Sequence, residues 1–118
     1  FQHCKRKFLD IPANRDAQRI IEIINKLYRK EHEIPPEYTS EQILEYRKEY
    51  APPILEELKE NLLAIQAKKT TLPKSNLGKA VNYTLNEYPA LCNYILNPEY
   101  ELDNNAIERI NRYTRWLN

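Results

Sequence analysis

The chain has 118 residues, enough for one domain with a buried core, and its 18 lysines and arginines nearly balance its 17 aspartates and glutamates, leaving a formal net charge of +1. That balance excludes a domain that is basic all over, so any contact with nucleic-acid phosphates has to be local. No apolar run approaches the roughly 20 residues of a membrane span and the charged start does not fit a signal peptide, which predicts a soluble cytoplasmic protein with no membrane partner.

The counts of glycine, methionine and cysteine narrow the class of protein further. With a single glycine, the chain lacks the residues that β-rich folds spend on turns and bulges, so an all-α fold is expected. A translated chain begins with methionine, and the complete absence of methionine predicts a segment of a longer protein. Cys4 and Cys92 have no metal-ligand spacing and are expected to be free thiols in a reducing compartment.

Prolines and polar clusters divide the chain, and the first long segment between them predicts a helix over residues 14–33. Apolar residues recur every three or four positions from Ala17 to Tyr28, as on one face of an amphipathic helix. Asn14 or Asp16 is placed to cap the N-terminus of this helix.

The next segment begins with Thr39 and Gln42, which have the spacing of a capping box. An apolar stripe that includes the position of Arg47 continues from there. A Pro-Pro pair at 52–53 interrupts the stripe. Because the residue before a proline avoids the helical region, we expect a sharp kink or two helices meeting near Ala51.

Two further helices are predicted in the second half of the chain. Ser75 is placed to cap a helix whose apolar residues share one side, with a bend at Pro89. An extended connector at residues 100–102 then leads to a final helix that begins near Asn105. Together these segments predict an all-α bundle of about five helices.

Four residues near the start of the chain are candidates for contact with DNA phosphates: His3, Lys5, Arg6 and Lys7. A short basic run is more commonly a solvated surface, so both interpretations stay open on the pattern alone. Tyr28, Tyr50 and Tyr88 lie on apolar stripes and are predicted to pack against the core instead of stacking on bases. No catalytic triad, phosphate loop or dinucleotide fingerprint is present, so no small-molecule cofactor is expected.

The final predicted helix carries the most informative polar face. At about 100° per residue, Glu108, Arg112 and Arg115 fall within roughly 60° of one another, opposite two apolar residues, Ile110 and Leu117. The pattern alone favours an exposed Glu–Arg pair one turn apart. The alternative puts Glu108 on a divalent metal ion and the arginines on phosphate oxygens.

Four segments resemble, in the same order, motifs of the insertion sequence 66 transposase family. Asp103–Arg109 (Asp-Asn-Asn-Ala-Ile-Glu-Arg), with Arg112 three residues further on, resembles the Asp-Asn-Asn-x-x-Glu-Arg signature of that family. Residues 73–86 resemble its Pro-Lys-Ser-x-Leu-Gly-Lys-Ala block. Pro53–Leu55 resembles its Pro-Leu-Leu helix start, and His3–Phe8 resembles its His-x-Arg-Arg-Lys-Phe element.

The resemblance implies a bacterial DDE transposase, whose RNase H-like core holds two aspartates and one glutamate with a helical insertion between the second aspartate and the glutamate. Residues 1–102 would be that insertion domain, and residues 103–118 would start the C-terminal, Glu-bearing helix of the core. Glu108 would be the catalytic and metal-binding glutamate. Three residues would cap this helix and fix the direction of the glutamate: Asp103, Asn104 and Asn105.

Two hypotheses follow for the function. In the first, the parent protein uses Mg²⁺ to cut and join DNA strands in transposition, and this segment helps to place transposon ends through five basic residues: Lys5, Arg6, Lys7, Arg109 and Arg112. The isolated chain would be inactive and hold no cofactor, because one carboxylate cannot hold a pair of Mg²⁺ ions. In the second, the chain is a helical module for DNA binding or for protein assembly, homo-oligomers included, without a catalytic role. An inert, truncated parent is a third reading.

Overall fold

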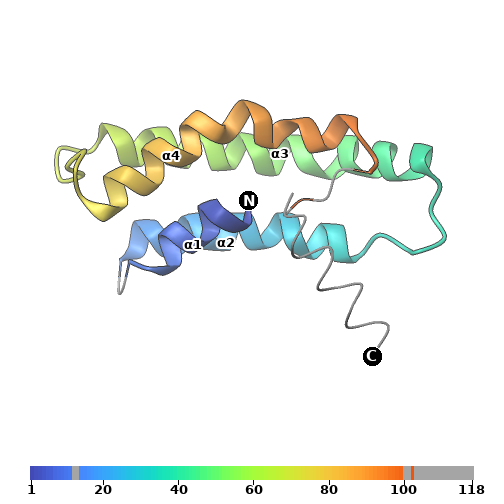
Figure 1. Cartoon of the computed structure of the whole chain (residues 1–118), viewed down its shortest axis with the longest axis horizontal. Coiled ribbons are helices and arrows are strands. Elements are labelled where there is room, and N and C mark those ends of the chain that lie inside the picture. The colour runs from blue at the N-terminus through green and yellow to red at the C-terminus, as the bar shows by residue number, and fades with distance from the viewer. Residues whose placement is uncertain (12–13, 100–101, 103–118) are drawn as a thin grey trace.

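The computed structural model describes residues 1–11, 14–99 and 102, which form a bundle of helices (Figure 1). These residues make four α-helices and one short 3-10 helix, with no strand among them: α1 (Gln2–Leu9), α2 (Arg15–His32), α3 (Ser40–Ala67), α4 (Asn76–Leu91) and η1 (Cys92–Leu96). The predicted all-α fold is confirmed, with four α-helices in this described part instead of about five overall. Residues 100–101 of the connector and the helix predicted from Asn105 lie outside the described residues.

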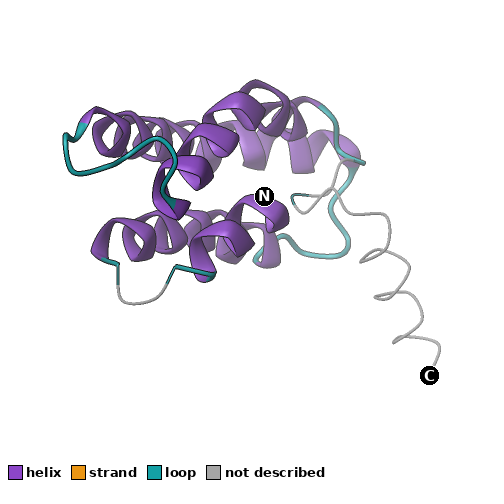
Figure 2. Cartoon of the chain, turned by 60° about the vertical axis from the view of Figure 1, so that its left-hand side comes forward, coloured by secondary structure: helices purple, strands orange, loops and turns teal. Residues whose placement is uncertain are grey.

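Each of the four helices packs against two others. α1 contacts α2 and α4, and α3 contacts the same two helices. Figures 1 and 2 show the four as two layers, α1 with α2 and α3 with α4. This arrangement places the start of the chain against α4, which comes far later in the sequence.

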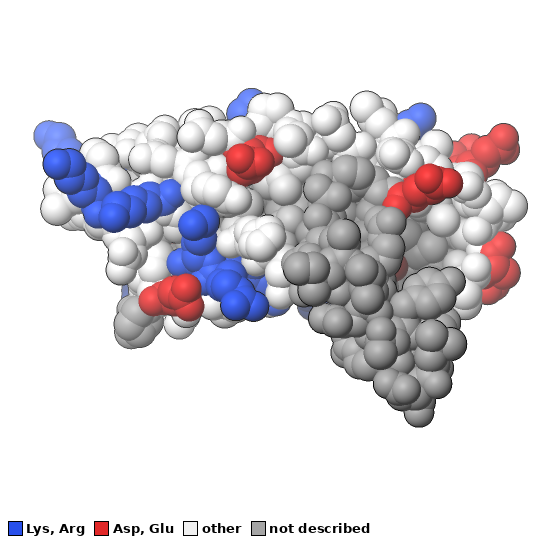
Figure 3. Space-filling view, in the orientation of Figure 1, with Lys and Arg blue, Asp and Glu red and all other residues white. Residues whose placement is uncertain are grey.

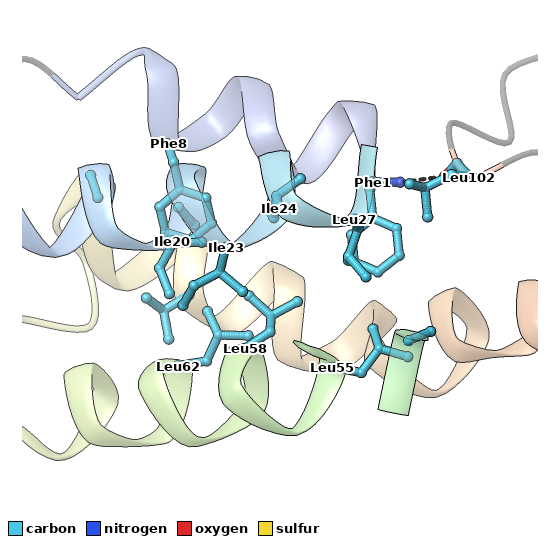
Figure 4. Packing of buried hydrophobic residues seen from close by; sticks show 14 of the residues in the cluster. Phe1, Phe8, Ile20, Ile23, Ile24, Leu27, Leu55, Leu58, Leu62 and Leu102 are labelled. Atoms are coloured by element: carbon cyan, nitrogen blue, oxygen red, sulfur yellow. Dashed lines mark hydrogen bonds between the residues drawn. The ribbon is translucent and has the colours of Figure 1, made fainter. Parts of the chain in front are cut away.

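The apolar stripes predicted from the sequence form the core between these layers (Figure 4). Ile20, Ile23 and Leu27 of α2 are fully buried, and they face Leu58 and Leu62 of α3. Burying each such side chain is worth roughly 1.5–3 kcal/mol relative to leaving it exposed, so these stripes contribute much of the stability of the bundle. Among the described helices none is long and apolar enough to cross a membrane.

Local signals in the sequence set where three of the helices begin. The Asn14 side chain accepts a hydrogen bond from the backbone N–H three residues later, at 2.9 Å. Thr39 and Gln42 form the predicted capping box, with bonds of 2.8 and 3.2 Å. Ser75 Oγ accepts from the third N–H of α4 at 3.0 Å. The predicted caps of α2, α3 and α4 are therefore confirmed.

Of the two arrangements expected near Ala51, that of two separate helices is wrong, because α3 runs as one helix through Pro52 and Pro53. Each proline removes the N–H that would bond to a carbonyl four residues earlier, here those of Lys48 and Glu49. Both prolines and both of these residues are exposed, so water can reach that side of the helix. Ala51 is fully buried on the opposite side and keeps this turn packed in the core.

Pro89, where a bend was predicted, lies inside α4, which continues to Leu91. The chain then tightens into η1. Tyr94, in the middle of η1, is fully buried and ties this short helix to the core.

Candidate functional site

The residues predicted to carry the chemistry fall outside the described part of the chain. This holds for Glu108, the predicted catalytic and metal-binding residue, and for its predicted caps and the two nearby arginines: Asp103, Asn104, Asn105, Arg109 and Arg112. Their roles stay predictions. Two sets of described residues bear on the site. They are the basic run of α1 and the residues whose contacts fix the segment that ends at Leu102.

The described residues provide no metal site and no activated thiol. Within residues 1–11, 14–99 and 102, no group of three or more His, Cys, Asp or Glu side chains is arranged to hold a metal ion. Cys4 and Cys92 are free, as predicted. Burial raises the pKa of both thiols, so neither is a ready thiolate ligand or nucleophile at neutral pH.

The basic run predicted to contact DNA forms α1, and the helix separates its members. The buried side of α1 lies between Lys5 and Lys7, which places them on opposite flanks. Lys5 is half-buried, with Nζ 5.3 Å from the centre of the Tyr28 ring on α2. Lys7 is exposed, with Nζ 4.5 Å from the centre of the Tyr83 ring on α4. The other two members are also exposed: His3 and Arg6.

A buried ion pair that the sequence analysis did not single out joins α2 to α3. Arg47 is only 4% exposed and makes two hydrogen bonds to Glu31, from Nε to Oε1 at 2.8 Å and from Nη2 to Oε2 at 3.0 Å. Arg47 Nη1 donates to the backbone carbonyls of Tyr94 and Asn97, at 2.8 and 2.9 Å. The signal for this pair in the sequence is an arginine at a position of an apolar stripe.

Two tyrosines complete this polar cluster. The Tyr50 hydroxyl donates to Glu31 Oε1 at 2.6 Å and lies 2.7 Å from the Tyr94 hydroxyl. Because a phenol has one proton to donate, Tyr94 is the donor to Tyr50. Burial raises the pKa of both phenols, so both stay neutral at neutral pH. The predicted core packing is confirmed for Tyr50, and the half-buried Tyr28 and Tyr88 pack against the core.

The polar cluster, made of Glu31, Arg47, Tyr50 and Tyr94, holds the stretch that leads to Leu102. Leu102 is 5% exposed and accepts a hydrogen bond at 3.2 Å from the backbone nitrogen of Phe1 (Figure 4). Phe1 is itself buried in the same core. The first residue of the chain and residue 102 therefore lie side by side, and Asp103 follows directly in the sequence.

Comparison with known proteins decides the family. Residues 1–114 match the family described as Transposase IS66 family. The chain belongs to the IS66 transposase family. It is also 30% identical over 110 residues to the uncharacterized protein y4jD of Sinorhizobium fredii, in an alignment that covers 91% of this chain and 21% of that protein. The IS66-family chain thus spans about a fifth of the length of this relative. No solved structure matches the IS66-family chain.

The family block at residues 73–86 forms the turn before α4 and most of that helix. Gly78 is buried where the helix crosses this turn, and a Cβ there would collide with the carbonyl oxygen of Leu72 and lie 3.0 Å from Pro73 Cα. Ser75 Oγ donates to the same carbonyl at 2.6 Å and caps the helix. The glycine of this IS66-family motif is therefore required for close backbone packing, which the sequence pattern alone did not assign.

Proposed function

We propose that the intact protein is a Mg²⁺-dependent DDE transposase that cuts and joins DNA strands at transposon ends, with Glu108 as its catalytic glutamate. Membership of the IS66 family supports a transposase, and the Asp103–Arg109 motif supports the choice of Glu108. In such enzymes, divalent ions held by three carboxylates activate the attacking water or 3′-hydroxyl and stabilise the leaving oxygen, and this chain would contribute one of those carboxylates. The chain alone is then expected to be inactive.

Within that enzyme, residues 1–102 would be a helical insertion and residues 103–118 would begin the Glu-bearing helix of the core. The observation that carries this assignment is that Phe1 and Leu102 are buried side by side in one core (Figure 4). Because these two residues lie side by side, polypeptide before Phe1 and polypeptide after Leu102 would leave the bundle at one place. Adjacent ends are the condition under which a domain can be inserted into another fold.

The polar cluster has a positioning role in this proposal. Arg47 holds the carbonyls of Tyr94 and Asn97, and Leu102 is buried directly before the capping motif. These contacts would set the point from which Asp103 to Asn105 start their helix and direct Glu108 toward the core.

The test is strand cleavage by the intact protein with Mg²⁺ and a transposon-end duplex. Glu108→Gln keeps the size of the side chain but removes its charge, and cleavage is expected to be lost while the helical circular dichroism spectrum is unchanged. Glu60→Gln, which makes the same change at an exposed position of α3, is the matched control and should cleave like the wild type. Full cleavage by Glu108→Gln would instead favour a helical binding or assembly module without a catalytic role.

A further inference from the structure

The near-zero net charge of the chain conceals two purely basic segments. Residues 1–9 and 68–86 together contain seven of the 18 lysines and arginines and none of the 17 acidic residues. The rest of the chain is therefore acidic overall. The two segments are far apart in the sequence, yet the first contains α1 and the second contains most of α4, and these two helices pack together.

The contact between α1 and α4 brings cations from both segments to one surface. Lys7 Nζ lies 4.5 Å from the centre of the Tyr83 ring, and Lys79 precedes Tyr83 by one helical turn on the same side of α4. His3 precedes Lys7 by one turn in the same way on α1, and Arg6 is exposed beside it. We call these five residues the α1/α4 basic face. Figure 3 shows most of the visible Lys and Arg gathered over this half of the molecule, where some Asp and Glu also lie, with further Asp and Glu at the opposite end.

The cations of the α1/α4 basic face are available to a ligand. Within the described residues, the ion pairs of other lysines and arginines join α2 to α3, link Lys30 to Glu33 at the end of α2, or connect Lys68 to Asp16. Arg6, Lys7 and Lys79 take part in none of these ion pairs within the described part of the chain. Tyr83 is 36% exposed. Partial burial raises the pKa of this phenol, and Glu87, which follows Tyr83 by one turn on α4, is close enough to raise that pKa further. The face therefore presents three cations outside these ion pairs, beside an accessible phenol, with one carboxylate at its edge.

We infer that the α1/α4 basic face binds the backbone phosphates of DNA, with α4 supplying Lys79 and Tyr83 as partners that the sequence analysis did not assign. The choice of DNA as the partner rests on the proposed function. Lysine is a flexible point charge suited to phosphate contact without base readout, and the Tyr83 hydroxyl can donate to a phosphate oxygen. Lys5, which the sequence analysis placed in the same group, faces Tyr28 on α2 and is not part of this surface.

The closing experiment measures binding of the 118-residue chain to a fluorescent duplex of arbitrary sequence by anisotropy, across a range of salt concentrations and without Mg²⁺. Lys7→Gln/Lys79→Gln is expected to weaken binding roughly tenfold and to lower the slope of log K against log salt by about 2, one unit for each lost phosphate contact. The matched control is Lys48→Gln/Lys59→Gln, which removes the same charge from α3. This control also matches the contact of Lys7 with a tyrosine ring, because Lys59 Nζ lies 5.7 Å from the centre of the Tyr88 ring. The control is expected to bind within about twofold of the wild type.

Three results would overturn the inference. The first is that the wild-type chain shows no salt-dependent binding up to about 100 μM at low salt. The second is that the two double variants lose equal DNA affinity. The third is that Lys7→Gln/Lys79→Gln loses no DNA affinity. Circular dichroism checks that both double variants keep their helices, as expected for exposed lysines. The assay contains no Mg²⁺ and measures no cleavage, so cleavage by the intact Glu108→Gln protein would refute the catalytic proposal and leave this binding test unaffected.

Discussion

Replacing Arg47 tests how the bundle is held together. In Arg47→Met, the methionine keeps an apolar stem but leaves Glu31, whose side chain is 16% exposed, without its cation. Removing one partner of a buried ion pair costs about 3–5 kcal/mol, because the remaining charge is uncompensated. The carbonyls of Tyr94 and Asn97 also lose their donor, so the upper part of that range is expected.

Urea unfolding followed by circular dichroism measures this loss. A domain with roughly 0.05–0.15 kcal/mol of stability per residue has about 6–18 kcal/mol at this length, so Arg47→Met should lower the unfolding midpoint substantially. Arg29→Met removes an exposed arginine from α2 and serves as the matched control. Its free energy of unfolding is expected to stay within about 0.5 kcal/mol of the wild type.

A double variant separates the ion pair from general damage to the core. Arg47→Met/Glu31→Gln removes both charges, so its loss of stability should be smaller than the sum of the two single losses by roughly 1–3 kcal/mol. The reasoning is refuted if Arg47→Met stays within about 1 kcal/mol of the wild type, or if the two single effects simply add.

Two further predictions concern the packing of α4 and the response to pH. Gly78→Ala is expected to lower stability by about 1–3 kcal/mol, although alanine ordinarily favours a helix, because its Cβ would collide with the Leu72 carbonyl; a raised urea midpoint would contradict this. Stability is expected to be level to about pH 9 and to fall above about pH 10, because burial raises the pKa of Tyr50 and Tyr94 in the folded state and the unfolded chain releases those protons first. Urea midpoints between about pH 7 and pH 11 measure this fall, which should be shallower in Tyr50→Phe.

The family and the all-α fold could be read from the sequence. The scarcity of glycine, the apolar stripes and the caps at Asn14, Thr39 and Ser75 are local signals, and the structure has the corresponding helices and caps. Four ordered motifs indicated the transposase family, which the match over residues 1–114 confirms. The catalytic role of Glu108 was predicted from one of these motifs, Asp103–Arg109, and stays a prediction because the motif lies outside the described residues.

Tertiary contacts decided the rest. Proline signals at 52–53 predicted a sharp kink or two helices, but the buried side of α3 is packed along its length and the prolines face solvent, so α3 continues as one helix. The basic run of α1 looked uniform in sequence, yet packing on two different helices turned Lys5 toward Tyr28 and Lys7 toward Tyr83.

The composition, helical periodicity and motifs of the sequence determined the fold class, the family and the candidate glutamate. Only the tertiary structure decided that Arg47 closes a polar cluster, that Phe1 meets Leu102 and that α1 and α4 share a basic face. The physical reason is distance along the chain. Capping and amphipathicity depend on residues three or four positions apart, whereas these three features join residues whose proximity exists only after the helices have packed.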